Sequence, residues 1–245
     1  MNDYSKIFNQ RGKEYHEANS LIPWARKKEF GAILDGLEFR PGQLVIDMPS
    51  GGGYLQQYLP EGIGYRGLEV SEVFAKAGSG TLCSWSKLPL QPESSDFVLV
   101  CAAFHHVSLQ DRQAFCQEVH RCLKTGGILR IADVQTGEPN ARFLNGFVDE
   151  HNPNGHRGDF IDEYLYGPIE TYGFALDDNR FSAYTWEMDV CLEKSLRFVR
   201  LLFGLTLASD EDLENELQKS LGLRKNEEGR WIIDWSLRVV TLRKQ

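Results

Sequence analysis

The sequence predicts an α/β fold in which a mostly parallel sheet carries helices on both faces. Three observations lead to this prediction. Short apolar runs of strand length alternate with amphipathic stretches of helix length over residues 44–134. The inner runs are apolar at successive positions, which is typical of strands buried on both faces of a parallel sheet. The first run ends in a carboxylate, Asp47, and opens into a glycine turn at residues 51–53.

This first strand and turn suit a small cofactor. Residues 44–46 are predicted to form the strand, and the residues from 54 onward a helix that packs back on it. In open α/β sheets a ligand lies outside the carboxyl ends of the strands, where glycines let backbone N–H groups approach it. A dinucleotide fingerprint would have its last glycine where Gln56 stands. The carboxylate of Asp47 also suits a cation better than a diphosphate.

A second acid follows where a nucleoside cofactor would need it. Residues 64–70 are predicted to form the next strand, and Glu69 lies at its carboxyl end, about twenty residues after the turn. An acid at this offset accepts hydrogen bonds from ribose hydroxyls. The two acids therefore predict a cationic nucleoside cofactor. A nicotinamide-dependent oxidoreductase is the alternative, against which Gln56 and Asp47 argue.

The rest of the chain continues the alternation and then departs from it. Helices are predicted before the first strand and again before the last one, and about a hundred residues separate the strand ending near Gln135 from the last strand. In chain order the remaining elements are helices at 6–18 and 24–37, a strand at 96–103, a helix at 111–123, a strand at 128–134, helices at 190–205 and 210–221, and a strand at 236–242.

Several ordered motifs carry a resemblance to a known family. They are Asp47-Met48-Pro49-Ser50-Gly51-Gly52-Gly53, Glu69, Leu88-Pro89-Leu90, Ser95-Asp96-Phe97, Phe104-His105-His106-Val107 and Leu123-Lys124-Thr125-Gly126-Gly127. Over about residues 40–135 the chain resembles the class I S-adenosyl-L-methionine (SAM)-dependent methyltransferases, particularly the small-molecule branch of type 11. The resemblance implies a Rossmann-like three-layer sandwich: a mostly parallel seven-stranded sheet with an antiparallel C-terminal strand and a helical lid insertion.

The resemblance also implies SAM as the cofactor and a set of residues around it. Asp47, Gly51 and Gly53 would surround its methionine part, Glu69 would hold the ribose, and Ser84 and Trp85 would lie near the adenine. Cys101 and Ala102 would lie beneath the amino-acid end, with Pro49, Ser50 and Val70 also in contact, and Tyr15 would contact the carboxylate from an N-terminal helix. The family usually has glycine in place of Pro49 and an acid in place of Ser84.

We expect a single domain over residues 1–245. It would consist of an N-terminal helical cover (1–40), a cofactor-binding core (41–135), a lid insertion (136–208) and a C-terminal helix with closing strands (209–245). The lid is rich in aromatic residues, which would either line a partly apolar substrate pocket or form the insertion's own core. They are Phe143, Phe147, Phe160, Tyr164, Tyr166, Tyr172, Phe174, Phe181, Tyr184 and Trp186.

Two histidines are candidate catalytic residues. His105 and His106 follow a predicted strand on the side where cofactor and substrate would meet, so an imidazole there could take a proton from the methyl acceptor. Methyl transfer by proximity alone is the alternative. His151 and His156, with Asp149 and Asp159, lack the spacing of metal ligands, and no metal site is expected.

The composition of the chain indicates which binding partners and which cellular compartment to expect. The chain has a net charge of −8, which argues against nucleic-acid binding. Its five cysteines form no C-x-x-C pair, its polar start is no signal peptide and no apolar run spans a bilayer, so we expect a cytoplasmic protein without membrane contact. The apolar helix at 190–205 would be core or a homodimer contact. These features predict methyl transfer to a small, partly apolar molecule, with a SAM-binding regulatory or inactive module as the alternative.

Overall fold

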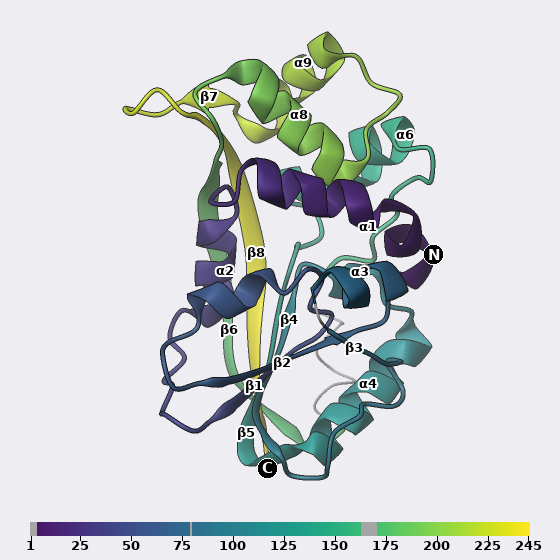
Figure 1. Ribbon diagram of the computed structural model, residues 1–245, viewed down its shortest axis with the longest axis vertical. Coiled ribbons are helices and arrows are strands. Elements are labelled where there is room, and N and C mark those ends of the chain that lie inside the picture. The colour runs from purple at the N-terminus through teal and green to yellow at the C-terminus, as the bar shows by residue number, and fades with distance from the viewer. Residues whose placement is uncertain (1–3, 79, 163–170) are drawn as a thin grey trace.

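A single sheet runs through the middle of the molecule, and helices cover both of its faces (Figure 1). The computed structural model describes residues 4–78, 80–162 and 171–245. The strands are β1 (Leu44–Asp47), β2 (Gly64–Glu69), β3 (Thr81–Leu82), β4 (Ser95–Cys101), β5 (Leu123–Asp133), β6 (Phe174–Glu187), β7 (Arg224–Lys225) and β8 (Trp231–Lys244). Their order across the sheet is β3-β2-β1-β4-β5-β8-β6, with β7 paired to β8.

The sheet is mostly parallel, which confirms the predicted fold class. The first five strands pair in parallel, whereas β8 runs antiparallel to both β5 and β6. The α-helices are α1 (Tyr4–Leu21), α2 (Lys27–Leu34), α3 (Glu72–Ala77), α4 (Leu109–Cys122), α5 (Pro139–Phe143), α6 (Asp149–His151), α8 (Leu192–Phe203) and α9 (Asp210–Leu221). Two 3₁₀ turns, η1 (Tyr54–Tyr58) and η2 (Phe104–His106), and a π-helical stretch, η3 (Leu144–Val148), complete the described elements.

Alternation along the inner strands gives the sheet a hydrophobic core on each face. Val45 belongs to the core that also contains Ile33 of α2, while its neighbour Ile46 belongs to the core that contains Phe115 of α4. Successive side chains of a strand point to opposite faces of the sheet. Both strand residues are fully buried because a hydrophobic core covers each of these faces. This two-sided burial holds the carboxyl ends of β1, β4 and β5 in fixed positions.

Part of the segment predicted as a helical lid is a strand. The prediction placed a lid at residues 136–208, but β6 lies within it and pairs along β8 from Phe174 opposite Lys244 to Glu187 opposite Ile232. The polar and acidic residues of β6 alternate with less exposed ones, as expected for an edge strand with one solvated face. Helical structure remains on either side of β6, in α5, η3, α6 and α8.

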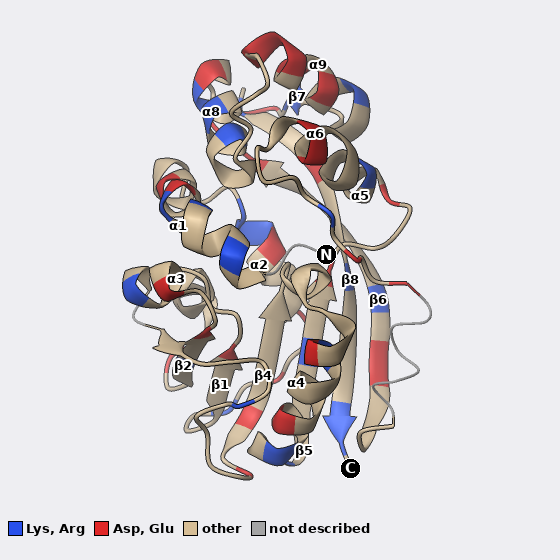
Figure 2. Ribbon diagram, turned by 90° about the vertical axis from the view of Figure 1, so that its right-hand side faces the viewer, with Lys and Arg blue, Asp and Glu red and all other residues tan. Residues whose placement is uncertain are grey.

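The N-terminal helix α1 lies above the carboxyl ends of the parallel strands, where it packs against α3 and α8 (Figure 1). Arg197 of α8 pairs with Glu17 of α1 at 2.6 Å, and Arg11 of α1 donates a hydrogen bond to the carbonyl of Leu202. Figure 2 shows basic and acidic residues spread over the helices, with α9 notably acidic. In the described part of the chain, no helix has both the length and the apolar character needed to cross a membrane.

Candidate active site

The glycine turn after β1 is held by the second acid. Gly51 and Gly53 have positive φ angles of 55° and 76°, which side chains disfavour. The N–H of Gly51 donates a 2.7 Å hydrogen bond to the carboxylate of Glu69. The helix predicted after the turn is only the 3₁₀ turn η1, because Pro60 favours an extended conformation at Leu59, where the structure has φ −77° and ψ 145°.

Asp47 ends β1 as a buried carboxylate. Its Oδ2 accepts a 2.9 Å hydrogen bond from the Tyr65 hydroxyl. Burial raises the pKa of Asp47 to about 7, and the nearby charge of Glu69 adds to the rise, although the Tyr65 hydrogen bond opposes it. A bound cation would favour the ionised form of such a carboxylate.

Glu69 ends β2 and is fully buried. It accepts hydrogen bonds from the backbone N–H groups of Gly51, Val70 and Ser71 at 2.7–2.9 Å. Burial raises the pKa of Glu69 to about 7, against the lowering effect of these hydrogen bonds. The Tyr4 hydroxyl of α1 also donates to Glu69, at 3.4 Å. Glu69 therefore shapes the glycine turn and is covered by α1.

A cavity beside the turn, which we call the turn cavity, collects much of the predicted cofactor set. It is lined by Tyr4, Phe8, Tyr15, Arg26, Phe30, Asp47, Pro49, Ser50, Gly51, Tyr54, Leu55, Phe74, Cys101, Ala102 and Ala103. Tyr15, Asp47, Pro49, Ser50, Gly51, Cys101 and Ala102 were predicted from the sequence. Gly53, Glu69, Val70, Ser84 and Trp85 are not among the lining residues, so their contacts with a cofactor stay predictions.

Ser84 and Trp85 follow β3, away from this lining. Ser84 is exposed and its hydroxyl lies 3.4 Å from that of Ser86. Trp85 is buried and packs edge-on against Phe115 of α4 and Tyr4 of α1. Tyr4 thus contacts both Trp85 and Glu69, and it joins the regions expected to hold the adenine and the ribose.

Residues of α1 form the roof of the site, and of these the sequence analysis singled out Tyr15 alone. Tyr4, Phe8, Arg11 and Tyr15 are spaced by four, three and four residues, which places them on one helix face. That aromatic spacing was the signal that could have identified them. Tyr15 in turn accepts a hydrogen bond from Arg26, whose guanidinium also pairs with the fully buried Glu29.

A second cavity adjoins the first, and we call it the histidine cavity. The two share Phe8, Tyr15, Arg26 and Ala102 in their walls. Ala102 has a φ of 49°, a strained conformation for alanine at the boundary between the cavities. The remaining lining residues are Arg11, Glu29, His105, His106, Val134, Leu144, His156, Trp186, Leu202, Phe203 and Trp235.

His105 is fixed by a buried carboxylate at the end of β5. Asp133 accepts hydrogen bonds from both the backbone N–H of His105, at 2.9 Å, and its Nδ1, at 2.7 Å. Because Nδ1 donates to the carboxylate, the neutral ring keeps a free lone pair on Nε2. His105 is thus oriented as a base would be.

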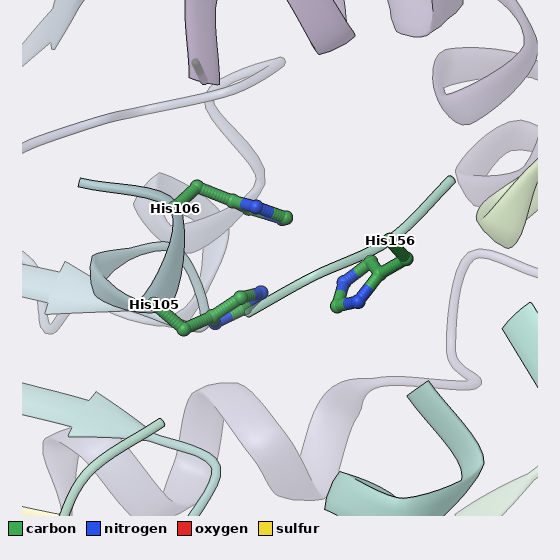
Figure 3. Close-up of side chains that lie close together, drawn as sticks. All are labelled: His105, His106 and His156. Atoms are coloured by element: carbon green, nitrogen blue, oxygen red, sulfur yellow. The ribbon is translucent and has the colours of Figure 1, made fainter. Parts of the chain in front are cut away.

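Two further imidazoles lie beside His105 (Figure 3). The ring centroids of His105 and His106 are 4.1 Å apart, and those of His106 and His156 are 4.9 Å apart. Burial lowers the pKa of His106 and of His156 well below the usual value, and the positive charge of Arg11 adds to both effects, so both rings are neutral. Nδ1 of His106 is buried without a hydrogen-bond partner.

Of the four polar residues that the sequence analysis considered for a metal, Asp149 accepts a 2.7 Å hydrogen bond from the backbone N–H of His156, whereas His151 and Asp159 have other partners. His151 stacks on Phe147 and its Nδ1 lies 2.9 Å from the carbonyl of that residue, while Asp159 pairs with Arg112. His156 instead joins His105 and His106. Local spacing could not predict this cluster, because about fifty residues separate its two segments.

Arg11 is a buried cation in the wall of the histidine cavity. Its Nη2 donates to the Leu202 carbonyl at 2.8 Å, but its Nε has no hydrogen-bond partner, and no carboxylate of the described residues forms an ion pair with it. Burial lowers the pKa of Arg11 to about 10, so it remains charged at neutral pH. Gly204 lies close by: a Cβ there would be 2.4 Å from Nε of Arg11.

The aromatic residues of the predicted lid serve mainly as core. Phe143 stacks on Phe147 and Phe174 is buried against His120, whereas Trp186 alone of the predicted set lines the histidine cavity. There Trp186 stacks on Trp235 with ring centroids 4.3 Å apart. Tyr164 and Tyr166 lie outside the described residues.

A wider cleft lies at the other end of the parallel strands, near their amino ends. Its charged side chains pair with one another: Arg243 with Asp177, Lys124 with Asp96, and Arg180 with Asp178. Ligands of open α/β sheets bind at the carboxyl ends of the strands. The two adjoining cavities, rather than this cleft, are therefore the candidate active site.

Comparison with known proteins bears on the family and the fold of the chain. Residues 46–131 match the family model described as a methyltransferase domain. Over 66% of its length the chain is 29% identical to ribosomal RNA-processing protein 8 of Caenorhabditis elegans, of which it spans 43%. It is also 29% identical, over 70% of its length, to malonyl-(acyl-carrier protein) O-methyltransferase 1 of Coxiella burnetii, of which it spans 60%. It thus spans less than two thirds of each of these relatives.

The fold itself is shared with solved methyltransferases. A SAM-dependent methyltransferase from Thermotoga maritima superposes with a TM-score of 0.62 over 98% of this chain and 99% of that one. The sequence identity is 19%, so this likeness bears on the fold alone.

Proposed function

Since the chain contains a class I SAM-dependent methyltransferase domain, whose methyl donor is S-adenosyl-L-methionine, we propose that it methylates a small, partly apolar molecule that carries an anionic group. One observation carries the proposal: two cavities adjoin at Ala102, one beside the glycine turn and the other beside His105 and Arg11. A donor and an acceptor held in adjoining cavities react as an intramolecular pair, which removes most of the entropic cost of their encounter.

The turn cavity fits the proposed cofactor by its chemistry. When bound, SAM supplies an electrophilic methyl group on a cationic sulfur. The carboxylate of Asp47 lines the cavity, where burial raises its pKa, and a cationic ligand would favour its ionised form. Tyr15, Ser50, Gly51 and the neutral thiol of Cys101, whose pKa burial raises, complete the polar contacts we propose.

Glu69 is proposed to hold the ribose after Tyr4 has moved aside. We expect Glu69→Ala to weaken binding of S-adenosylhomocysteine by roughly 1.5–3 kcal/mol, the range for hydrogen bonds to a charged group. Titration calorimetry measures this change. Glu72→Ala on the surface of α3, where the side chain is 66% exposed, is the matched control and should bind normally. Equal affinity of Glu69→Ala and Glu72→Ala, with both variants folded, would exclude the assignment.

The pH dependence of SAM binding tests Asp47. Its pKa of about 7 lies above the ordinary value of 3.8, so below pH 7 the folded, ligand-free protein favours the protonated form of this carboxyl, and the contribution of Asp47 to stability falls as the pH rises from about 4 to about 7. The cationic ligand prefers the ionised form. The dissociation constant for SAM should therefore increase toward low pH, approaching about tenfold per pH unit below 7. Asp47→Asn should bind SAM weakly and with a smaller pH dependence, because Glu69, whose pKa is also about 7, still titrates in this range. A wild-type dissociation constant that is constant from pH 6 to 8 would contradict the proposal.

In the histidine cavity, the proposed acceptor loses its proton to His105. Asp133 holds Nδ1 of this ring, which leaves Nε2 to accept the proton and stabilises the imidazolium that results. Trp186, Phe203 and Trp235 form an apolar wall, and the unpaired guanidinium of Arg11 would bind the anionic group. Both features favour an acceptor such as an aromatic or aliphatic acid that bears a hydroxyl, thiol or amine.

We favour a small molecule over RNA as the acceptor, although four relatives are named ribosomal RNA-processing protein 8. The net charge of the chain is −8, and α9 carries a dense group of acidic residues (Figure 2). Phosphate-binding surfaces instead gather lysine and arginine. His105, His106 and His156 are also each at most 6% exposed, which suits a small ligand enclosed by the protein better than a polymer on its surface.

A further inference from the structure

We propose that His105, His106 and His156 form a binding site for one divalent transition-metal ion of the kind that prefers imidazole ligands, with Zn²⁺ as the representative. The proposal does not depend on methyl transfer, because metal binding can be measured directly. In the described part of the chain these three residues are the group whose ligand atoms converge, all within 4.8 Å of one another.

Two short segments bring the imidazoles together (Figure 3). His105 and His106 lie on the turn η2, and His156 lies on the loop after α6. The Asp159 N–H donates to the His105 carbonyl at 2.9 Å, and Arg112 pairs with Asp159 while donating to the Phe104 carbonyl. The loop is thus fastened to the turn independently of the three rings.

Packing leaves the rings close to the arrangement that a metal requires. A Zn–N bond of about 2.0–2.1 Å in a tetrahedral site separates the ligand nitrogens by roughly 3.3–3.4 Å. With the nitrogens at present up to 4.8 Å apart, metal binding would draw them closer by at most about 1.5 Å through rotation of the rings. Phe160 packs against both His105 and His156, with centroids 5.2 and 6.3 Å away, and confines these rotations.

The hydrogen bonds of the three imidazoles are compatible with metal coordination. Asp133 receives Nδ1 of His105 and so acts as the carboxylate that orients a ligating histidine. Nδ1 of His156 faces the Asn145 amide oxygen at 3.4 Å. Nδ1 of His106 has no hydrogen-bond partner although it is buried, and coordination would satisfy it.

The site would be an open one. Three protein ligands leave a fourth tetrahedral position, as in catalytic rather than structural zinc sites. That position faces the histidine cavity, in which an acceptor hydroxyl or thiol could bind the ion and thereby lose its proton more readily. In the metal-bound protein His105 is then a ligand, and its role as the base belongs to the metal-free protein.

Arg11 provides a second feature of the site. Its positive charge lines the same cavity and opposes a bare cation. We therefore expect Arg11→Met to bind Zn²⁺ more tightly than the wild type. In the wild type, an anion that bridges Arg11 and the metal would likewise make Zn²⁺ bind more tightly.

The test uses the full chain, stripped with a chelator and titrated with ZnCl₂ by calorimetry, and with Co²⁺ by visible absorption. We expect one ion per chain and the intense d–d bands of four-coordinate Co²⁺. His156→Gln and His106→Gln should each weaken binding at least about tenfold, and Asp133→Asn about 10–100-fold. His151→Gln is the matched control, because His151 stacks on Phe147 outside the cluster, and it should bind as the wild type does.

Absence of saturable Zn²⁺ binding would overturn the proposal, and so would equal binding by His156→Gln and His151→Gln. The Co²⁺ spectrum of the wild type needs no variant, so a variant that fails to fold leaves the test intact. S-adenosylhomocysteine binding is measured on the same stripped samples. If the protein binds S-adenosylhomocysteine but not Zn²⁺, the proposed metal site is wrong and the proposed methyl transfer stands. If it binds Zn²⁺ but not S-adenosylhomocysteine, the metal site stands and the proposed methyl transfer is wrong.

Discussion

Replacing His105 with alanine is expected to lower kcat by about 10²–10⁴-fold while the affinity for S-adenosylhomocysteine stays nearly unchanged. The reason is that Nε2 of His105 is the nitrogen that Asp133 leaves free, and it faces the cavity next to the proposed donor. A single-turnover assay with the chelated protein measures the chemical step and excludes any contribution from a bound metal. The matched control is His151→Ala, outside the cavity, which should react at the wild-type rate.

Asp133 should act through His105 as a positioning residue. Asp133→Asn keeps the size of the side chain, but the amide no longer holds the proton of His105 on Nδ1. We therefore expect a lower maximal kcat and a shift in the pH dependence of kcat. A purely structural role would leave the pH profile of the remaining activity in place. If His105→Ala slows a single turnover by no more than a few fold, proximity is the better account of the reaction.

The second large effect is expected at Arg11. Arg11→Met should raise KM for an anionic acceptor by about 10–100-fold, because a charged hydrogen bond in a buried site contributes roughly 1.5–3 kcal/mol. The measurement compares methylation of carboxylic acids with that of their amides, as matched pairs. The wild type should prefer the acids, and the variant should have lost this preference.

A surface arginine serves as the control for Arg11. Arg197 lies on α8 with 61% of its side chain exposed and is not among the residues that line the histidine cavity, so Arg197→Met removes the same charge outside the site. It should leave the preference for acids unchanged. A wild-type protein that methylates amides as well as the corresponding acids would contradict the proposed acceptor class.

Local patterns predicted those parts of the fold whose cause is local. The helix predicted at residues 210–221 coincides with α9, because Ser209 and Asp212 form a capping box and Gly222 takes the left-handed conformation that ends it. The strand at residues 44–46 was equally clear, since an apolar run followed by glycines has few other solutions in an α/β chain.

The sequence analysis missed those features that depend on contacts between residues far apart in the chain. The strand β6 has polar residues at many positions, and only its long pairing with β8 makes it part of the sheet. His156 joins His105 through a loop fastened by Asp159 and Arg112, a contact that no periodicity encodes. The cover that Tyr4 places on Glu69 likewise depends on where α1 lies relative to β2.

One helix of 18 residues, α1, takes part in both halves of the proposed reaction. Its first turn supplies Tyr4 to the acid that would hold the donor, while Arg11, two turns later, lines the cavity for the acceptor. A displacement of α1 that admits one substrate therefore rearranges the wall that meets the other. Under the proposed function, a substitution on this helix would therefore alter both the exchange of the cofactor and the choice of acceptor.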